Sequence, residues 1–202
     1  CLGDRDVDRV VRVLVVDADP QGNATKMITG GSLADYRKHQ IGGIYQALND
    51  GGASTKKQII DVPAVGVHLL LGSENLGLFP AKDFKGDVND AVNKMLAPIR
   101  DNYDYILIDT GPALNHLLTS IVIASDGVVA MFQPGELCYD AIKTFVPSIE
   151  AVREKVGGGR LLGILCSLID GRLADHKDYI DMIHNRYGDL CFKTKIKMRA
   201  AT

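Results

Sequence analysis

Residues 12–25 read RVLVVDADPQGNAT and run from an apolar segment directly into two aspartates, a proline and small polar residues. A continuous apolar run without alternation is typical of a strand buried on both faces of a parallel sheet. Ligands of α/β sheets bind beyond such strand ends, because loops and helix N-termini converge there. Residues i and i+2 of a strand share a face, so we expect Asp17 and Asp19 to face one ligand.

Other apolar runs repeat this pattern along the chain. They are VVRVLVV (10–16), VGVHLLLG (65–72), YDYILID (103–109), DGVVAMF (126–132) and LLGILCSLI (161–169). Between them, apolar residues recur with helical spacing in four stripes. The stripes are Val92, Met95, Leu96 and Ile99; Leu114, Leu117, Leu118, Ile121 and Val122; Ile142, Phe145, Ile149 and Val152; and Ile180, Ile183 and Tyr187. Asp87 is placed to cap the first helix, Pro147 to kink the third and Gly188 to end the last.

The alternation of strands and helices predicts the fold class. It indicates an α/β, doubly wound fold with a mostly parallel sheet, right-handed crossovers and helices on both faces. A chain of 202 residues is long enough to bury a sizeable core. We expect residues 1–202 to form a single domain, because the glycine-rich segments 49–55 and 155–160 are typical of loops rather than linkers.

Composition excludes several classes of protein. The chain is 46% hydrophobic and 24% charged with a formal charge of -2, which is typical of a globular protein and not of a disordered one. No global basic field exists, so contact with nucleic acid needs a local patch. The four cysteines form no C-x-x-C motif, and neither a signal peptide nor an apolar run of about 18 residues is present. These features predict reduced thiols, a cytoplasmic location and no membrane segment.

Polar residues follow two further strands. Asp109 and Thr110 end the run at 103–109, and Gln133 follows the run at 126–132. Because the carboxyl ends of parallel strands meet at one edge, we expect Asp109 to lie near Asp17 and Asp19. Three carboxylates at one edge repel one another, which favours a bound cation, a polarised water or a phosphate with its magnesium.

The acidic pair has several interpretations. A single aspartate after a strand is commonly a turn or helix-cap residue. A phosphatase of the haloacid dehalogenase type uses the first aspartate as nucleophile, but Pro20 and Gln21 do not match its motif. A phosphorelay receiver is excluded because Asp109 lies too far along the chain for a domain of roughly 120 residues. An ATPase of the P-loop class, in which carboxylates hold magnesium and orient water, fits the pattern best.

The segments RVLVVDADPQGNAT (12–25) and YDYILIDTGPALNHLLTSIVIASDGVVAMFQP (103–134) resemble the ParA family of partition ATPases, within the ParA/MinD superfamily of deviant Walker ATPases. The resemblance extends over residues 10–202, and DADPQGNAT is specific to this family within the superfamily. It implies binding and slow hydrolysis of ATP with Mg²⁺, an ATP-dependent homodimer, nonspecific DNA binding, and a centromere-binding partner that is ParB-like. It also implies a cytoplasmic, nucleoid-associated protein of plasmid or chromosome partition.

The resemblance also assigns roles to residues. Asp19 would orient and activate the attacking water, Asp17 would lie beside the γ-phosphate and magnesium, and Asp109 would hold magnesium through water. The nucleotide-binding set that it implies is Asp17, Gln21, Gly22, Asn23, Thr110, Gly111 and Arg172. For Arg172, in the segment DGR, a nucleotide-side and a DNA-side role both remain open.

The sequence departs from the family pattern at its phosphate-binding loop. The family opens with a strand and a glycine-rich Walker A loop, and no G-x-x-x-x-G-K-[ST] occurs in these 202 residues. We expect the chain to be incomplete at both ends, lacking that strand and loop and the last helices. As given, it is expected to bind ATP poorly and to be inactive. The alternative is a degenerate, noncatalytic binding module; an Asp17-nucleophile phosphatase is a more distant one.

Basic residues near the end of the sequence are the candidate DNA contacts. They are Lys193, Lys195, Lys197 and Arg199. Alternating lysines are equally typical of a solvated edge strand that is protected from aggregation, so the two interpretations remain open. Lys197 and Gly111 stand where the family commonly has prolines, and the histidines show no metal-ligand spacing.

Overall fold

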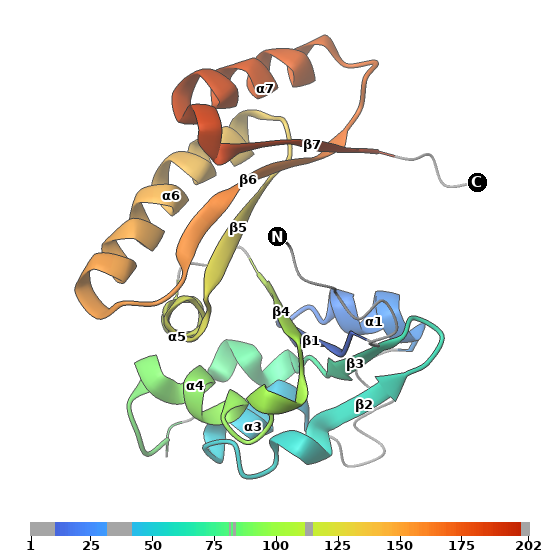
Figure 1. The fold of residues 1–202 in the computed structure, drawn as a ribbon, viewed down its shortest axis with the longest axis vertical. Coiled ribbons are helices and arrows are strands. Elements are labelled where there is room, and N and C mark those ends of the chain that lie inside the picture. The colour runs from blue at the N-terminus through green and yellow to red at the C-terminus, as the bar shows by residue number, and fades with distance from the viewer. Residues whose placement is uncertain (1–10, 32–41, 81, 83, 112–114, 199–202) are drawn as a thin grey trace, which may run out of the picture. The chain divides into compact units, whose positions relative to one another are not determined.

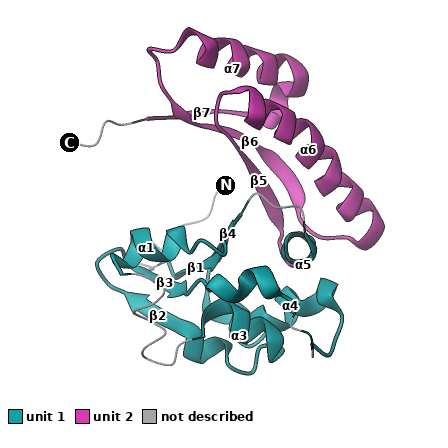
Figure 2. Ribbon diagram, turned by 180° about the vertical axis from the view of Figure 1, so that it is seen from behind, with its two compact units in different colours: residues 1–121 teal, residues 122–202 magenta. Residues whose placement is uncertain are grey.

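The computed structural model describes residues 11–31, 42–80, 82, 84–111 and 115–198. The chain divides into two compact units, unit 1 over Cys1–Ile121 and unit 2 over Val122–Thr202 (Figures 1 and 2). The helix α5 (His116–Ala124) contains the boundary between them. Each unit has its own hydrogen-bonded sheet.

Unit 1 contains a four-stranded sheet in the order β2-β3-β1-β4. Its strands and α-helices before α5 are β1 (Val13–Ala18), α1 (Asn23–Thr29), α3 (Gly43–Asn49), β2 (Ile59–Val62), β3 (Val67–Leu70), α4 (Ala91–Leu96) and β4 (Tyr105–Thr110). Short 3₁₀ turns are η1 (Thr55–Gln58), η2 (Glu74–Leu78), η3 (Val88–Asp90) and η4 (Arg100–Asn102). β1 runs parallel to both β3 and β4, whereas β2 pairs antiparallel with β3.

Helices lie on both faces of the sheet of unit 1. On one face, Val15 of β1 and Ile28 of α1 pack against a cluster from β2 and β3. Leu14 and Val16 alternate with Val15 and are fully buried, and α3 contacts β1. Figure 1 shows α1 on one side of the strands and α3 with α4 on the other. Helices on both faces are therefore confirmed for this unit.

Unit 2 contains a parallel three-stranded sheet in the order β5-β6-β7. Its elements are β5 (Gly127–Phe132), α6 (Glu136–Val156), β6 (Arg160–Ile169), α7 (Ala174–Tyr187), η5 (Gly188–Leu190) and β7 (Cys191–Lys197). Phe132, Ile164 and Cys166 of the sheet are fully buried and pack against Ile142 of α6 and Ile183 of α7. The amphipathic stripes predicted for these two helices therefore form the core.

Most of the predicted elements are present. The five apolar runs overlap β1, β3, β4, β5 and β6, and the four helical stripes overlap α4, α5, α6 and α7. Ile99 of the first stripe lies beyond α4, and Leu114 of the second lies outside the described residues. Asp87 accepts a hydrogen bond from the Asn89 N–H at the start of η3, and Gly188 is the C-cap of α7. Pro147 lies inside α6, which is assigned as one helix. The antiparallel strand β2 was not predicted.

The prediction that every apolar run is buried on both faces is wrong for two strands. Tyr105 and Leu107 of β4 are 62% and 57% exposed, and Val129 and Met131 of β5 are 42% and 55% exposed. In each strand the two exposed residues are two positions apart and therefore share one face, so that face is open to solvent at these positions. Whether residues 1–202 form a single domain remains a prediction.

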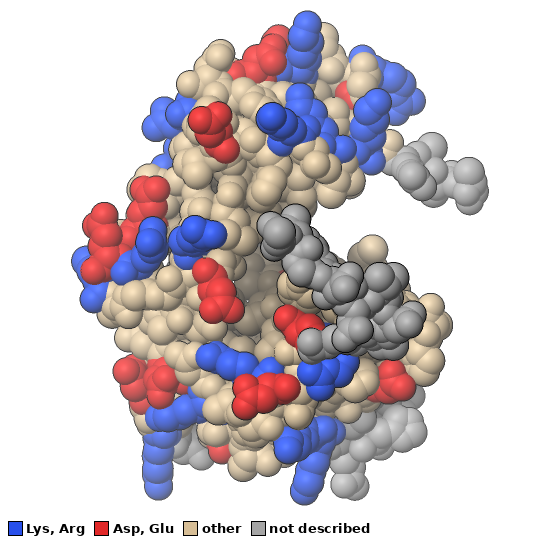
Figure 3. Space-filling view, in the orientation of Figure 1, with Lys and Arg blue, Asp and Glu red and all other residues tan. Residues whose placement is uncertain are grey.

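Charged side chains of both signs lie on the surface. Figure 3 shows acidic and basic side chains on the face in view. In the part of the chain that the structure describes, Cys138, Cys166 and Cys191 are free thiols. No helix in that part is both long enough and apolar enough to cross a bilayer.

Candidate functional site

Pairing of β1 with β4 brings the predicted carboxylates together. The two parallel strands are aligned from Val13 opposite Tyr105 to Ala18 opposite Thr110, and in this register Asp17 lies directly opposite Asp109. Asp19 follows β1 immediately. The acidic residues therefore meet at the carboxyl edge of one sheet, which is the edge where α/β proteins bind ligands.

Asp17 is fully buried and hydrogen-bonded to backbone. Its Oδ2 accepts the Thr25 N–H at 2.7 Å, and its Oδ1 accepts the Asp19 N–H at 3.3 Å. This differs from the expectation that Asp17 and Asp19 face one ligand. β1 ends at Ala18, so the alternation of a strand does not extend to Asp19, and the two carboxylates have different surroundings.

Asp19 heads the loop between β1 and α1. Its Oδ1 accepts the Gln21 N–H at 2.9 Å, and its backbone carbonyl accepts the Gly22 N–H at 2.9 Å. Gly22 is the N-cap of α1 with a φ of 61°, a left-handed conformation that glycine adopts at no steric cost. A methyl group at Gly111 would lie 3.4 Å from Asp19 Oδ1, so the loop after β4 approaches this carboxylate closely.

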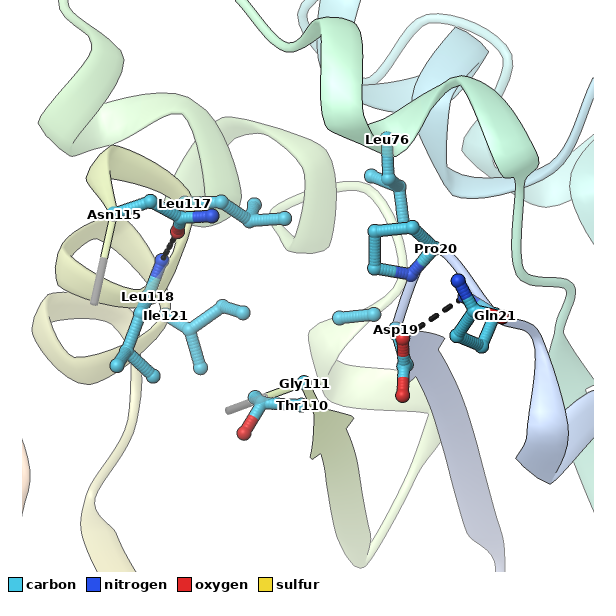
Figure 4. A pocket seen from close by; sticks show the side chains of 11 residues that line it. Asp19, Pro20, Gln21, Leu76, Thr110, Gly111, Asn115, Leu117, Leu118 and Ile121 are labelled. Carbon is cyan, nitrogen blue, oxygen red and sulfur yellow. Dashed lines mark hydrogen bonds between the residues drawn. The ribbon is translucent and has the colours of Figure 1, made fainter. Parts of the chain in front are cut away.

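A cavity of about 290 Å³ opens beside Asp19. Figure 4 shows Asp19, Pro20 and Gln21 on one side, Thr110 and Gly111 at the end of β4, and α5 on the other side. The remaining lining residues are Ala18, Leu76, Asn115, Leu117, Leu118 and Ile121. Of the predicted nucleotide-binding set, Gln21, Thr110 and Gly111 line this cavity, whereas Asp17, Gly22 and Asn23 do not.

Burial and the neighbouring carboxylates affect the ionisation of Asp109. The pKa of Asp109 is raised above its ordinary value, first by desolvation and then by repulsion from Asp17 and Asp19. Negative charge therefore accumulates at this edge, and a cation would relieve the repulsion. Among the described residues, no group of three or more His, Cys, Asp or Glu side chains is arranged to hold a metal ion. The role of Asp109 in holding magnesium through water remains a prediction.

Arg172 belongs to unit 2, in the turn between β6 and α7. Its guanidinium binds Asp170 with contacts of 2.6, 2.9 and 3.2 Å. This pairing is the main cause that holds the pKa of Asp170 well below its ordinary value. Asp170 also donates its N–H to Nδ1 of the buried His176 at 3.1 Å. In this structure Arg172 therefore stabilises the turn that contains it.

The candidate DNA-binding lysines lie on β7, which is an edge strand of unit 2. Lys193, Lys195 and Lys197 are exposed and alternate with Phe192, Thr194 and Ile196. Arg199 lies outside the described residues. The edge position agrees with the interpretation as a solvated edge strand, and the DNA-binding role of these lysines remains a prediction.

Two contacts at the site were missed by the sequence analysis. The Thr25 N–H donates to Asp17, and the N–H of Gly72, which follows the end of β3, donates to the Thr25 hydroxyl. A glycine after the apolar run at 65–72 was the available signal, because glycine often marks a close backbone approach. Asn115, whose Oδ1 accepts the Leu118 N–H at 2.9 Å, caps α5 beside the cavity.

Comparison with known proteins finds a matching family model and several relatives. A family model described as "AAA domain" (AAA_31) matches residues 7–158. An uncharacterised protein of Pseudomonas putida is 30% identical over 187 residues, covering 92% of this chain and 69% of the relative. The chromosome-partitioning ATPase Soj of Thermus thermophilus is 29% identical, covering 92% of this chain and 68% of the relative.

Solved structures show the same fold. The crystal structure of cobyrinic acid a,c-diamide synthase from Mycobacterium smegmatis with bound ADP and magnesium superposes with a TM-score of 0.79 at 23% identity, covering 95% of this chain and 76% of that one. The fold is therefore the α/β fold of P-loop nucleoside triphosphatases. Within that class, the chain belongs to the ParA/MinD family of ATPases.

Proposed function

We propose that this chain carries the acidic half of a magnesium-ATP site and that the complete protein hydrolyses ATP in DNA partition. The observation that carries the proposal is the pairing of β1 with β4, which sets Asp17 opposite Asp109 with Asp19 beside a cavity. The Thermus relative is named a chromosome-partitioning ATPase, and the Mycobacterium structure holds ADP and magnesium. Both names support this reading.

The surroundings of each residue indicate its role in the proposed hydrolysis. Asp19 lines the cavity, so it is the carboxylate that orients a water for attack on the terminal phosphate. Asp109 is the last residue but one of β4. Its pKa is raised first by desolvation and then by the charges of Asp17 and Asp19, and a magnesium shell would offset these charges. Magnesium, when bound, neutralises developing charge on the phosphates. Thr110, Gly111 and Gln21 line the same cavity and would contact the nucleotide.

The site lacks a source of positive charge. None of the described residues that line the cavity is a lysine or an arginine, and the sequence holds no Walker A loop. Among the described residues, β4 is paired on one side only, and such an edge favours pairing with a further strand. This supports the expectation that a strand outside these 202 residues supplies the phosphate-binding loop.

The wider activity follows from family membership. We propose an ATP-dependent homodimer in the cytoplasm that associates with the nucleoid through nonspecific DNA binding. A ParB-like centromere-binding protein is the expected partner. The exposed Lys193, Lys195 and Lys197 on β7, with Arg199, are the DNA contacts that we propose.

The test compares Asp19→Ala with a matched control in the complete natural reading frame. Asp19→Ala is expected to bind ATP with unchanged affinity and to lose hydrolysis by roughly 100-fold, the scale of removing a positioned acid–base group. Asp178→Ala, at an exposed position on α7, is expected to hydrolyse ATP like the parent. Equal hydrolysis by Asp19→Ala and the parent contradicts the assignment.

Experiments on the complete protein also distinguish the two alternative functions. A complete reading frame that binds no ATP favours the noncatalytic binding module. Trapping of a phosphate mimic such as beryllium fluoride on Asp17 without nucleotide favours the phosphatase, although Asp17 is fully buried and its two oxygens accept backbone N–H groups.

A further inference from the structure

Thr25 joins two loops of unit 1 at a fully buried position. Its backbone N–H donates to Asp17 Oδ2 at 2.7 Å, and its hydroxyl oxygen accepts the Gly72 N–H at 3.0 Å. The first contact binds the start of α1 to β1. The second binds the same helix to the chain that leaves β3. One residue thus holds α1 to two neighbouring strands of the sheet.

Neither the Thr25 N–H nor the Gly72 N–H has a partner in the regular hydrogen bonding of a helix or a strand. Thr25 is in the first turn of α1, whose N-cap, Gly22, provides no side-chain hydrogen bond. First-turn N–H groups have no partner inside a helix, so Asp17 supplies the one that Thr25 needs. Gly72 lies beyond Leu70, where β3 ends, and its N–H is likewise outside the ladder. A buried N–H without a partner is costly, so both bonds are structurally important.

The same carboxylate also holds Asp19. Asp17 Oδ1 accepts the Asp19 N–H at 3.3 Å while Oδ2 accepts Thr25. The loop between them is closed by the Gly22 N–H on the Asp19 carbonyl at 2.9 Å and by Lys26 Nζ on the Gln21 carbonyl at 2.7 Å. The position of Asp19 relative to the sheet therefore depends on the anchoring of Asp17 and Thr25.

We propose that Thr25 is a positioning residue for the proposed hydrolysis, acting through its hydroxyl bond to Gly72 and its N–H bond to Asp17. The inference rests on the proposed function of Asp19. Thr25 does not line the cavity, so it touches no substrate. Its hydroxyl fixes the loop that carries Asp19, and loss of the hydroxyl releases that loop from the end of β3.

The test uses three variants of the complete reading frame. Thr25→Val keeps the shape and removes the hydroxyl, whereas Thr25→Ser keeps the hydroxyl. Thr29→Val is the matched control, because the Thr29 hydroxyl bonds to the Thr25 carbonyl at 2.7 Å and to the Gly31 N–H at 3.1 Å, without reaching β3. Thr25→Val is expected to lower kcat by roughly 10- to 100-fold with KM within about threefold, since small misplacements of reacting groups have effects on this scale.

The pattern across the variants decides the outcome. Retention of most of kcat by Thr25→Ser and Thr29→Val supports positioning by the hydroxyl. Parental kcat in Thr25→Val overturns the proposal. So does an equal loss in Thr29→Val, which would indicate a general weakening of α1, or a loss confined to KM.

A second measurement needs neither nucleotide nor activity. Amide hydrogen exchange of the parent is expected to show Gly72 protected, and Thr25→Val is expected to speed Gly72 exchange by roughly 2- to 10-fold, the equivalent of one net hydrogen bond. Thr25→Ser and Thr29→Val leave it unchanged. An unprotected Gly72 in the parent overturns the proposal even if a variant does not fold. If Gly72 is protected but the parent does not hydrolyse ATP, the proposed function is refuted, whereas the hydrogen bond between Gly72 and Thr25 is confirmed.

Discussion

Gly72→Ala tests how tightly the chain after β3 packs against Asp17. A methyl group built on Gly72 lies 2.8 Å from Asp17 Oδ2 and 2.9 Å from Asp17 Cγ. A side-chain end can often move away from such a contact. Asp17 cannot do so without cost, because Oδ2 holds the Thr25 N–H at 2.7 Å in a fully buried site.

The magnitude follows from two opposing effects. Overpacking of this kind costs about 1–3 kcal/mol. The φ of Gly72 lies outside the left-handed range, so alanine adds no backbone strain and gains about 0.4–1 kcal/mol through the unfolded chain. We therefore expect Gly72→Ala to lower the free energy of unfolding by about 1–2 kcal/mol. With a urea m-value of about 2–3 kcal/mol per M, the midpoint falls by roughly 0.5 M.

Urea denaturation of the parent and two variants is the assay. Gly77→Ala is the control, because a methyl group at Gly77 meets nothing within 4 Å and its φ is also ordinary. Gly77→Ala is expected to keep or slightly raise the midpoint. A midpoint for Gly72→Ala equal to or above that of the parent would refute the argument that Asp17 is held rigidly by its backbone contacts.

Two further predictions concern charge. The pKa of Asp109 is raised from 3.8, so the folded state binds this proton more tightly than the unfolded state, and ionisation destabilises the fold as pH rises above 3.8. Because Asp109 is exposed, screening limits the effect. Without magnesium, Asp109→Asn is expected to raise the free energy of unfolding by about 0.5 kcal/mol at pH 7 and not at all near pH 3.5. A gain in stability that does not shrink on acidification contradicts this. Reversing Lys195 and Lys197 to Glu is expected to weaken DNA retention and reduce its salt slope by roughly 2, and an unchanged slope moves the DNA contact away from β7.

The sequence predicted those elements whose patterns are long or continuous. β6 was located to within a residue by its apolar run, and α7 was recognised from its helical stripe and from Gly188 at its end. β2 was missed since Ile59–Val62 is short and contains Asp61, an exposed residue. Its antiparallel pairing with β3 depends on a partner that no local pattern identifies.

The meeting of Asp17 with Asp109 was predictable, whereas their surroundings were not. Parallel strands align their carboxyl ends, which is sufficient to bring both residues to one edge. The burial of Asp17 depends on Thr25 from α1 and on the close approach of Gly72. Those contacts arise from how the two loops pack, and spacing along the chain carries no information about them.

The charge balance of the site connects its stability with its function. Asp109 ionises against Asp17 and Asp19, and none of the described residues lining the adjoining cavity carries positive charge. An asparagine at position 109 is expected to hold the same place at lower electrostatic cost. A cost of this kind is typical of functional sites. A bound cation would offset the repulsion, and we therefore expect magnesium with a nucleotide to stabilise the complete protein more than it stabilises Asp109→Asn.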